Sequence, residues 1–329
     1  MRAAAILGLG CTEKDLRPFQ SNSDATWLLG LPGTSAEADA ILIFGGDGTV
    51  HRHLAQLVKL QLPVLVVPCG SGNDFARALG LRSVRDSLAA WRDFSSGRGK
   101  VRAIDLGLIA PLQSQIADLA RSKAEVSGVA ADPSGSPLSQ GQRPCSTQNL
   151  TAEAPAPYGH YFCCVAGVGL DADVARRANQ LPRWLRGHGG YAVSLPASLF
   201  HFAPSAMKIS GADGHGALVT RSDKPTVLAA FANTPAYGSG MKIAPRARMD
   251  DGLLDLCIVS NIDKFKLFCL FPTVYFGRHL SRPEVDYSQV TCARIETEKP
   301  LDVYADGEFV CQTPVEVSVA RGALRVISR

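Results

Sequence analysis

A glycine-rich corner follows a buried apolar segment in the first quarter of the chain. The stretch "ILIFGGDGTVHRHL" runs from four apolar residues into Gly45, Gly46, Asp47, Gly48 and Thr49. If a strand ends there and a helix begins, bare backbone N–H groups gather at a helix N-terminus, and both they and the helix dipole favour a phosphate. Asp47 would repel a phosphate, so its carboxylate fits if a Mg²⁺ ion lies between the two. The alternative is a plain strand-to-helix turn in which Asp47 or Thr49 is a helix cap.

A second small-residue loop follows the next apolar segment. The stretch "PCGSGNDFAR" places Gly70, Ser71 and Gly72 before a helix, with Asn73, Asp74 and Arg77 in its first turns. Asn73 or Asp74 could be a simple N-cap. Two such loops at the carboxyl ends of strands in one sheet line one crevice, where ligands normally bind. The pair therefore predicts a nucleotide phosphate site. It is not of the Walker type, because no GxxxxGK[ST] occurs, and "GLG" at 8–10 is only a fragment of a dinucleotide motif.

Three further aspartates could each have either a structural role or a role in a binding or catalytic site. Asp105 lies between apolar residues of a predicted strand, where a buried carboxylate needs a partner such as Arg77 or Mg²⁺; an exposed strand end is the alternative. Asp306 belongs to "YADGEF", and Asp251 to "RARMDDGLLDL". Both are followed by glycine, and Asp-Gly is a strong signal for a tight hairpin turn. For these two residues the pattern alone does not decide between a turn and a metal or catalytic role.

The elements that must position these residues follow two different patterns. Strands and helices alternate over residues 1–110, which predicts a parallel sheet covered by helices. Residues 111–158 are rich in Ala, Ser, Gln, Gly and Pro and read as a linker or disordered insertion. Short strands dominate residues 159–329, with helices near 171–179 and 263–276. The fold class is therefore α/β plus β: an N-terminal three-layer α/β nucleotide-binding domain with a parallel sheet, then a C-terminal β-sandwich.

Composition narrows the class of protein. The 329 residues are 46% hydrophobic and 19% charged, as in a globular enzyme, and a net charge of +4 is too small to argue for nucleic acid as a partner. No apolar run reaches the length of a transmembrane helix, and the N-terminal run is shorter than a signal peptide needs. Nine cysteines without CxxC pairs predict reduced thiols, neither a disulfide framework nor a zinc site. We therefore expect a cytoplasmic protein.

Six motifs in order resemble the diacylglycerol kinase catalytic-domain superfamily. This superfamily includes bacterial lipid kinases, eukaryotic diacylglycerol kinases, and sphingosine and ceramide kinases. The motifs are "GGDGTV", "GSGNDFAR", "AIDLG", "AGVGLDADV", "NTPAYGSGMKIAPRARMDDGLLDL" and "ADGE". They cover most of the chain apart from the insertion and the first 40 residues. The family fold is an α/β nucleotide domain followed by a β-sandwich, and its reaction transfers the γ-phosphoryl group of ATP to a lipid hydroxyl.

The resemblance assigns roles to the residues that match these motifs. Ser71 and the first loop would surround ATP, and Asp47 would hold the nucleotide Mg²⁺ through water. Asp74, Arg77 and Asp105 would form a supporting charged network, with Asp74 near the metal. Asp306 would be the general base that takes the proton from the lipid hydroxyl, with Glu308 nearby to tune or replace it. A second, structural Mg²⁺ would bind the Asp251 carboxylate and the backbone carbonyls of Arg248 and Leu253.

The sequence also departs from the family pattern. The family usually has an Asn-Pro motif after the first strand, and "GLGCTEKD" stands there instead. The insertion at 111–158 is longer than the family norm and could be a disordered tether, a regulatory element or a membrane contact. The apolar stretches 189–204 and 263–277 read either as sandwich core and packed helix or as an acyl-chain cleft or interfacial surface.

We predict an ATP- and Mg²⁺-dependent lipid kinase acting on diacylglycerol or a related lipid alcohol. Its expected partner is lipid at the membrane surface, contacted transiently and without a transmembrane segment, and a homodimer is possible. One alternative is a kinase of a soluble metabolite such as NAD or a sugar phosphate. The other is a nucleotide- or lipid-binding relative without catalysis.

Overall fold

The computed structural model describes residues 1–112, 159–181, 194, 198–199, 202–212, 217–238, 240–260 and 262–328. Within these ranges, no helix is both long and apolar enough to cross a membrane. The predicted insertion, apart from its first two residues, and most of the apolar stretch 189–204 lie outside the described residues.

The N-terminal domain is built on parallel strands. Each neighbouring pair in the order β4-β3-β1-β2 is parallel, as the alternating pattern predicts. The apolar strand before the first glycine corner, β3, is buried along its whole length. The strands are β1 (Arg2–Leu7), β2 (Thr26–Leu29), β3 (Ala40–Gly45) and β4 (Val64–Pro68).

Four helices connect and cover these strands. Val50, Leu54, Leu57 and Val58 recur at helical spacing, and all four are buried in the helix that follows β3. The sequence interpretation missed the first helix, which contains Pro18 and begins in a capping box between Thr12 and Asp15. The helices are α1 (Glu13–Gln20), α2 (Asp47–Leu60), α3 (Asp74–Ala78) and α4 (Val84–Ser95).

The C-terminal domain is mostly antiparallel sheet, as its short strand patterns predict. A buried apolar cluster lies among its strands and includes Phe162, Phe231 and Leu256. Helices α6 (Leu170–Gln180) and α9 (Lys264–Val274) and the short 3-10 helix η1 (Arg278–Ser281) accompany the sheet. The strands are β6 (His160–Phe162), β7 (Val165–Gly169), β8 (Ser205–Ala212), β9 (Leu218–Ser222), β10 (Pro225–Ala232), β11 (Leu254–Ser260), β12 (Val285–Val290), β13 (Cys292–Thr297), β14 (Asp302–Ala305) and β15 (Glu308–Gln312).

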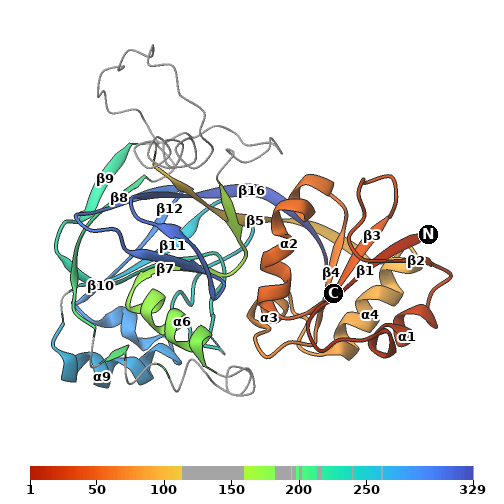
Figure 1. Cartoon of the computed structure of the whole chain (residues 1–329), viewed down its shortest axis with the longest axis horizontal. Coiled ribbons are helices and arrows are strands. Elements are labelled where there is room, and N and C mark those ends of the chain that lie inside the picture. Colours follow the sequence, from red (N-terminus) through yellow and green to blue (C-terminus); the bar gives the residue numbers. More distant parts are fainter. Residues whose placement is uncertain are drawn as a thin grey trace, which may run out of the picture.

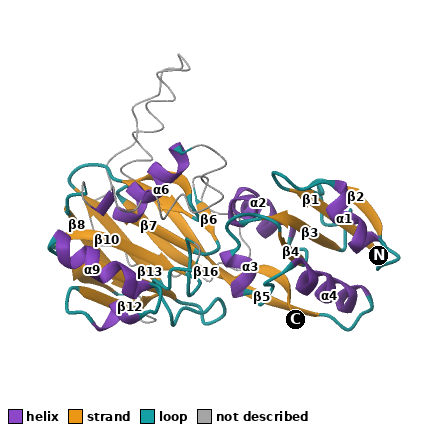
Figure 2. Cartoon of the chain, turned by 90° about the horizontal axis from the view of Figure 1, so that it is seen from below, coloured by secondary structure: helices purple, strands orange, loops and turns teal. Residues whose placement is uncertain are grey.

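Two long strands join the domains. β5 (Lys100–Pro111) and β16 (Val315–Ser328) pair antiparallel along most of their length. β16 also pairs with β13 in the C-terminal domain and in parallel with β4 of the N-terminal domain, where Val326 lies opposite Val64. Figure 1 shows both strands running from one domain into the other, and Figure 2 shows the same arrangement from below. Hydrogen-bonded sheet, and not a flexible linker, therefore fixes how the domains face one another.

Candidate active site

The two glycine loops lie against each other at the carboxyl ends of β3 and β4. A Cβ atom added to Gly46 would lie 2.3 Å from the carbonyl oxygen of Gly72, and one added to Gly70 would lie 2.4 Å from Cα of Gly46. The Asp47 N–H donates to the same Gly72 carbonyl at 3.0 Å. No side chain larger than glycine fits at either contact without moving backbone. The two loops therefore lie side by side, as expected from their places at the carboxyl ends of neighbouring strands, and the phosphate site stays a prediction.

Asp47 binds the second loop and not its own helix. One of its carboxylate oxygens accepts from the N–H of Asp74 and the other from the N–H of Phe75, each at 3.0 Å. These are the first N–H groups of α3, so Asp47 caps α3 although it begins α2. The N-cap of α2 is Gly46, without a side-chain hydrogen bond. The alternative interpretation, in which Asp47 or Thr49 caps the helix after β3, is therefore wrong.

Among the described residues, no Lys, Arg or His forms an ion pair with the Asp47 carboxylate. Burial and the nearby Asp74 charge, with a smaller contribution from Asp306, raise its pKa to about 6, while the Phe75 and Asp74 amides act in the opposite direction. Mutually repelling carboxylates of this kind offer hard oxygen atoms to a divalent cation. The residues present thus fit the predicted Mg²⁺, because the Asp47 carboxylate is buried near the charge of Asp74.

The rest of the second loop is closed by its own hydrogen bonds. Asn73 occupies the N-cap position of α3 but makes no side-chain cap hydrogen bond. Its side chain donates to the Gly70 carbonyl at 2.6 Å and accepts from the Gly70 N–H at 3.2 Å, so it closes the loop. Asp74 is 5% exposed and forms an ion pair with Arg77 one turn later. Ser71 is exposed at the tip of the loop. The buried Thr49 packs beneath the first loop, where Cβ atoms added to Gly8 or Gly45 would collide with its side chain.

Asp105 is buried, but its partners are not those that the sequence suggested. Its two carboxylate oxygens accept from the N–H groups of Gly252 and Gly322, each at 2.7 Å. It therefore fastens the Asp251-Gly252 segment and β16 to β5 and is not bonded to Arg77. Because Asp105 is 5% exposed and lies well inside β5, the exposed strand-end interpretation is also wrong.

Asp306 occupies a tight turn and is also held as a charged group. Its φ is +51° and that of Gly307 is +86°, the backbone that a two-residue hairpin with an Asp-Gly turn adopts between β14 and β15. Its carboxylate accepts from the N–H groups of Cys163 and Cys164 at 2.8 Å and of Val165 at 3.2 Å. The predicted turn is confirmed, and the same turn presents a fully buried carboxylate to three amides.

His51 is the fourth partner of Asp306. Its Nδ1 lies 3.0 Å from Oδ2 of Asp306, and the two side chains are 13% and 0% exposed. Burial disfavours the ionised carboxylate, but the hydrogen bond and charge of His51, together with the Cys163 and Cys164 amides, hold the pKa of Asp306 below its usual value. Burial likewise opposes charge on His51, yet the hydrogen bond and charge of Asp306, aided by Glu308, raise its pKa.

Two amide side chains brace this arrangement. Asn233 is fully buried and donates to the carbonyls of Asp105 at 2.9 Å and Cys163 at 3.1 Å, so it joins β5 to the segment that holds Asp306. Asn179, near the end of α6, donates to the Gly307 carbonyl at 2.8 Å. Asn179 therefore holds the turn itself, and Asn233 holds the segment whose N–H groups bind Asp306. The sequence interpretation did not single out either residue.

Glu308 lies at the boundary between the domains. A Cβ atom added to Gly48 would lie 3.2 Å from Oε1 of Glu308, so the C-terminal hairpin reaches the first turn of α2. Glu308 itself is exposed. Its side chain therefore lies near the first glycine loop, a contact that the sequence did not suggest.

The predicted second metal site contains a turn. Oδ1 of Asp251 accepts from the N–H of Leu253 at 3.1 Å, and Gly252 has φ +72°. The side chain of Arg248 pairs with Asp250 at 3.2 Å. This supports the turn interpretation of Asp251, and the structural Mg²⁺ at Asp251, Arg248 and Leu253 stays a prediction.

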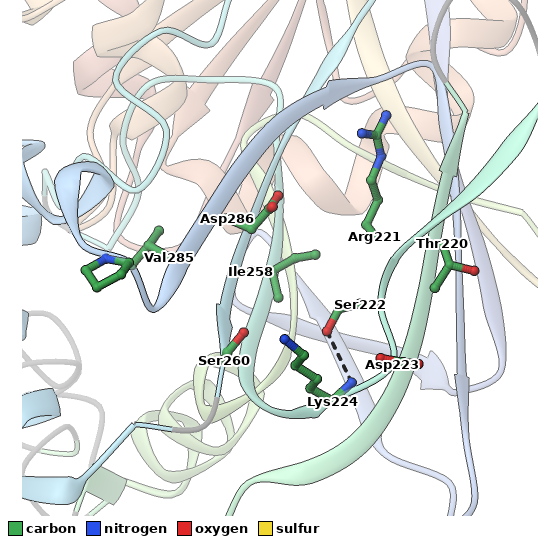
Figure 3. A pocket seen from close by; sticks show the side chains of 10 residues that line it. Thr220, Arg221, Ser222, Asp223, Lys224, Ile258, Ser260, Val285 and Asp286 are labelled. Atoms are coloured by element: carbon green, nitrogen blue, oxygen red, sulfur yellow. Dashed lines mark hydrogen bonds between the residues drawn. The ribbon is translucent and has the colours of Figure 1, made fainter.

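A pocket on the C-terminal domain lies apart from these residues. It has a volume of about 310 Å³ and is lined by the end of β9, the following turn, β11 and the segment that leads into β12. Figure 3 shows Arg221 and Lys224 around it together with Asp223 and Asp286. None of the residues that line it is among the predicted site residues, and its charges of both signs favour no particular ligand.

His51 is the main residue that sequence reasoning missed. It directly follows the first motif, one helical turn after Asp47 and so on the same face of α2. Nothing local indicated its partner, which is 255 residues away. Asn233 opens the "NTPAYGSGM" motif, and its role likewise depends on distant strands.

Sequence comparisons agree with an α/β domain followed by a β-sandwich-like domain. The profile of the diacylglycerol kinase catalytic domain matches residues 13–109, and that of the YegS C-terminal NAD kinase beta sandwich-like domain matches residues 164–328. A diacylglycerol kinase of Mycobacterium tuberculosis is 31% identical over 289 residues, which are 88% of this chain and 76% of that protein. The chain belongs to the diacylglycerol kinase and YegS-like lipid kinase family.

More distant relatives have the same organisation. A diacylglycerol kinase of Bacillus subtilis is 21% identical over 282 residues, which are 85% of this chain and 74% of that protein. The crystal structure of a diacylglycerol kinase from Bacillus anthracis superimposes with a TM-score of 0.59 at 16% identity, covering 100% of this chain and 97% of the other. At that identity the structural match supports the fold alone.

Proposed function

We propose that this protein is an ATP- and Mg²⁺-dependent lipid kinase that phosphorylates the hydroxyl of diacylglycerol or a related lipid alcohol. The observation that carries the proposal is the contact between His51 of the nucleotide domain and Asp306 of the sandwich domain. This contact supports the proposal, because the pair would accept a proton close to the glycine loops that would bind phosphate. The names of the relatives support the choice of a lipid acceptor.

The N-terminal domain would bind the nucleotide. The N–H groups of Gly46 and Gly48 and the exposed Ser71 would contact phosphate oxygens at the start of α2, because the Asp47 and Thr49 N–H groups already donate to backbone carbonyls. Bound Mg²⁺ would neutralise phosphate charge, held by Asp47 and Asp74. Arg77 pairs with Asp74 and so fixes its orientation.

The paired side chains would accept the proton of the lipid hydroxyl. In the transfer, the lipid oxygen forms a bond to the γ-phosphorus, and the bond from that phosphorus to the oxygen bridging the β- and γ-phosphates breaks. The hydroxyl proton passes to the pair. His51 is the member with exposed surface, so its Nε2 is the atom that a hydroxyl reaches without rearrangement, while Asp306 holds the ring through Nδ1. The ring must be neutral to accept a proton, so the reaction should slow at acidic pH.

The substrate determines where the protein works. Diacylglycerol resides in bilayers and ATP in the cytoplasm, so the enzyme would act at the cytoplasmic membrane surface, as a peripheral protein. A homodimer and the second Mg²⁺ stay predictions.

A phosphorylation assay tests the proposal. The protein is supplied with labelled ATP, Mg²⁺ and a panel of diacylglycerol, ceramide, sphingosine, NAD and sugar phosphates, and the products are identified by mass. Labelled lipid phosphate is the expected result. Label in NAD or a sugar phosphate would replace the lipid acceptor with a soluble one. Binding of ATP with no labelled product in any mixture would favour a relative without catalysis.

A further inference from the structure

Helix α9 packs one face against the domain core, and several large apolar residues lie on its other face. Leu267 and Leu270 are 9% and 7% exposed and contact the domain core. Phe265 and Phe276, by contrast, are 75% and 73% exposed. A packed helix of a globular domain normally carries polar residues on its outer side. The aromatic outer side of α9 is therefore not explained by folding of the domain.

The exposed residues follow one line along the helix. Phe265, Phe268, Cys269 and Pro272 recur at spacings of three and four, and Phe276 continues the line just past the helix end. Tyr275 is 37% exposed beside it. Large exposed aromatic side chains gathered in this way mark an interaction surface more often than an ordinary surface. We call this set, Phe265, Phe268, Tyr275 and Phe276, the aromatic face.

Basic residues flank the aromatic face along the chain. Residues 264–282 contain Lys264, Lys266, Arg278 and Arg282 and no Asp or Glu. All four basic side chains are on exposed residues. Of the neighbouring acids, Asp263 is the N-cap of α9, and Glu284 lies 3.9 Å from Lys266. This short segment alone carries four positive charges, as many as the net charge of the whole chain.

We propose that the aromatic face of α9 inserts into the interface of an anionic lipid bilayer. Aromatic rings prefer the boundary between headgroups and acyl chains, and a rim of Lys and Arg is attracted to anionic headgroups. The inference rests on the proposed function, since a lipid acceptor requires the enzyme to reach a bilayer. Figure 1 shows α9 at the end of the C-terminal domain that faces away from the N-terminal domain, so docking there leaves the nucleotide loops uncovered.

Vesicle co-sedimentation tests the surface directly. The full chain is mixed with phosphatidylcholine vesicles, with or without a minority of phosphatidylglycerol, and bound protein is measured after centrifugation. The parent should bind the anionic vesicles much more strongly. The double variant Phe265→Ser/Phe276→Ser should lose about tenfold or more in partition, because each ring removes apolar contact area. Lys266→Gln/Arg282→Gln should lose the preference for anionic vesicles.

A matched control separates this face from general surface polarity. Leu29 and Val219 are 53% and 56% exposed and lie on β2 and β9, away from α9. Leu29→Ser/Val219→Ser should bind vesicles like the parent. Equal loss in both double variants, or unchanged binding of the Phe variant, would overturn the proposal. So would a parent that sediments as a dimer when the Phe variant is a monomer, since the occupant would then be a second copy of the chain.

An assay with a water-soluble lipid substrate distinguishes failure of this proposal from failure of the proposed function. Short-chain diacylglycerol offered as monomers without vesicles should be phosphorylated equally by the parent and by Phe265→Ser/Phe276→Ser. Absence of diacylglycerol phosphorylation in the parent, with vesicle binding that still depends on the aromatic face, would contradict the proposed function and leave the docking surface standing. Phosphorylation of diacylglycerol together with vesicle binding that does not depend on the aromatic face would support the proposed function and overturn the docking surface.

Discussion

Nδ1 of His51 lies 3.0 Å from Oδ2 of Asp306. This contact joins the beginning of α2 in the N-terminal domain to the β14–β15 hairpin of the C-terminal domain. The Asp306 carboxylate is fully covered and already accepts three backbone hydrogen bonds. A catalytic base must reach the proton that it takes. We therefore expect the proton acceptor to be the His51–Asp306 pair and not Asp306 alone.

His51→Asn should separate the two roles of the histidine. The Asn side-chain N–H₂ can replace Nδ1–H as the donor to Asp306, but it cannot take a proton. We expect near-parent folding and a fall in kcat of roughly 10²- to 10⁴-fold, with the acidic limb of kcat/KM lost. In the parent that limb should lie above pH 6.5, because the pKa of His51 is raised. Glu308→Gln is the control and should be milder. Near-parent kcat in His51→Asn would mean that the ring only holds Asp306.

Asp306→Asn should destabilise the fold in a pH-dependent way. An amide N–H₂ would face backbone N–H donors, at a cost of about 1–3 kcal/mol. The pKa of Asp306 is lowered in the folded state, so its contribution is present above its usual value and is lost as pH falls through the folded value. The part that depends on charged His51 is lost as pH rises through the raised histidine pKa. Urea unfolding of parent and variant should therefore differ most at about pH 5 to 6, and a constant difference from pH 3 to 9 would refute this account.

Asp47→Asn should remove a stability penalty together with the activity. With a folded pKa of about 6, the Asp47 carboxyl favours the folded state when protonated, and that contribution is lost as pH rises through 6. The loss is at most about 3 kcal/mol. The stability of the variant relative to the parent should thus rise between pH 4 and pH 7.5 in metal-free buffer, measured by thermal unfolding. Mg²⁺ with ATP should stabilise the parent at pH 7.5 and not the variant. A difference that does not vary with pH would argue against a buried, unpaired carboxylate.

Gly46→Ala should disrupt the contact between the two loops. Its backbone angles are accessible to alanine, but the new Cβ would lie 2.3 Å from the Gly72 carbonyl oxygen. We expect a loss of about 1–3 kcal/mol and weaker ATP binding, measured by urea unfolding and calorimetry. Gly48→Ala is the control for stability. Its Cβ meets only the flexible end of Glu308 at 3.2 Å, and alanine is favoured in a helix. Equal stability of the two variants would show that the loops can separate freely.

Asp105→Ala should lower the stability of the fold more than it affects catalysis. It would leave the N–H groups of the buried Gly252 and of the exposed Gly322 without their acceptor, which should cost about 1–3 kcal/mol in urea unfolding, mainly from Gly252. Asp105→Asn keeps one acceptor and should lose less. The folded fraction of Asp105→Asn should retain much of its activity. Inactive enzyme of parent-like stability would instead place Asp105 in the catalytic machinery.

The sequence alone determined the local features of this protein. The strands before Gly45 and Pro68, the buried stripe of α2 and the Asp306-Gly307 turn follow from neighbouring residues, because apolar periodicity and turn chemistry act over a few positions. The order of the motifs was likewise enough to indicate the family and the two-domain organisation. The short β9 strand and α1 were missed, because the first has mixed polarity and the second contains proline.

Only the tertiary structure decided which of these groups meet. Asp47 caps α3, Asp105 binds Gly252 and Gly322, and His51 binds Asp306 across 255 residues. The pairing of β16 with both β5 and β4 sets these contacts. Strand register and domain packing bring each of these partners into place, and the residues next to it in the sequence do not predict any of the contacts. The same holds for α9, whose apolar sequence is equally compatible with burial and exposure until packing selects the face that contacts the core.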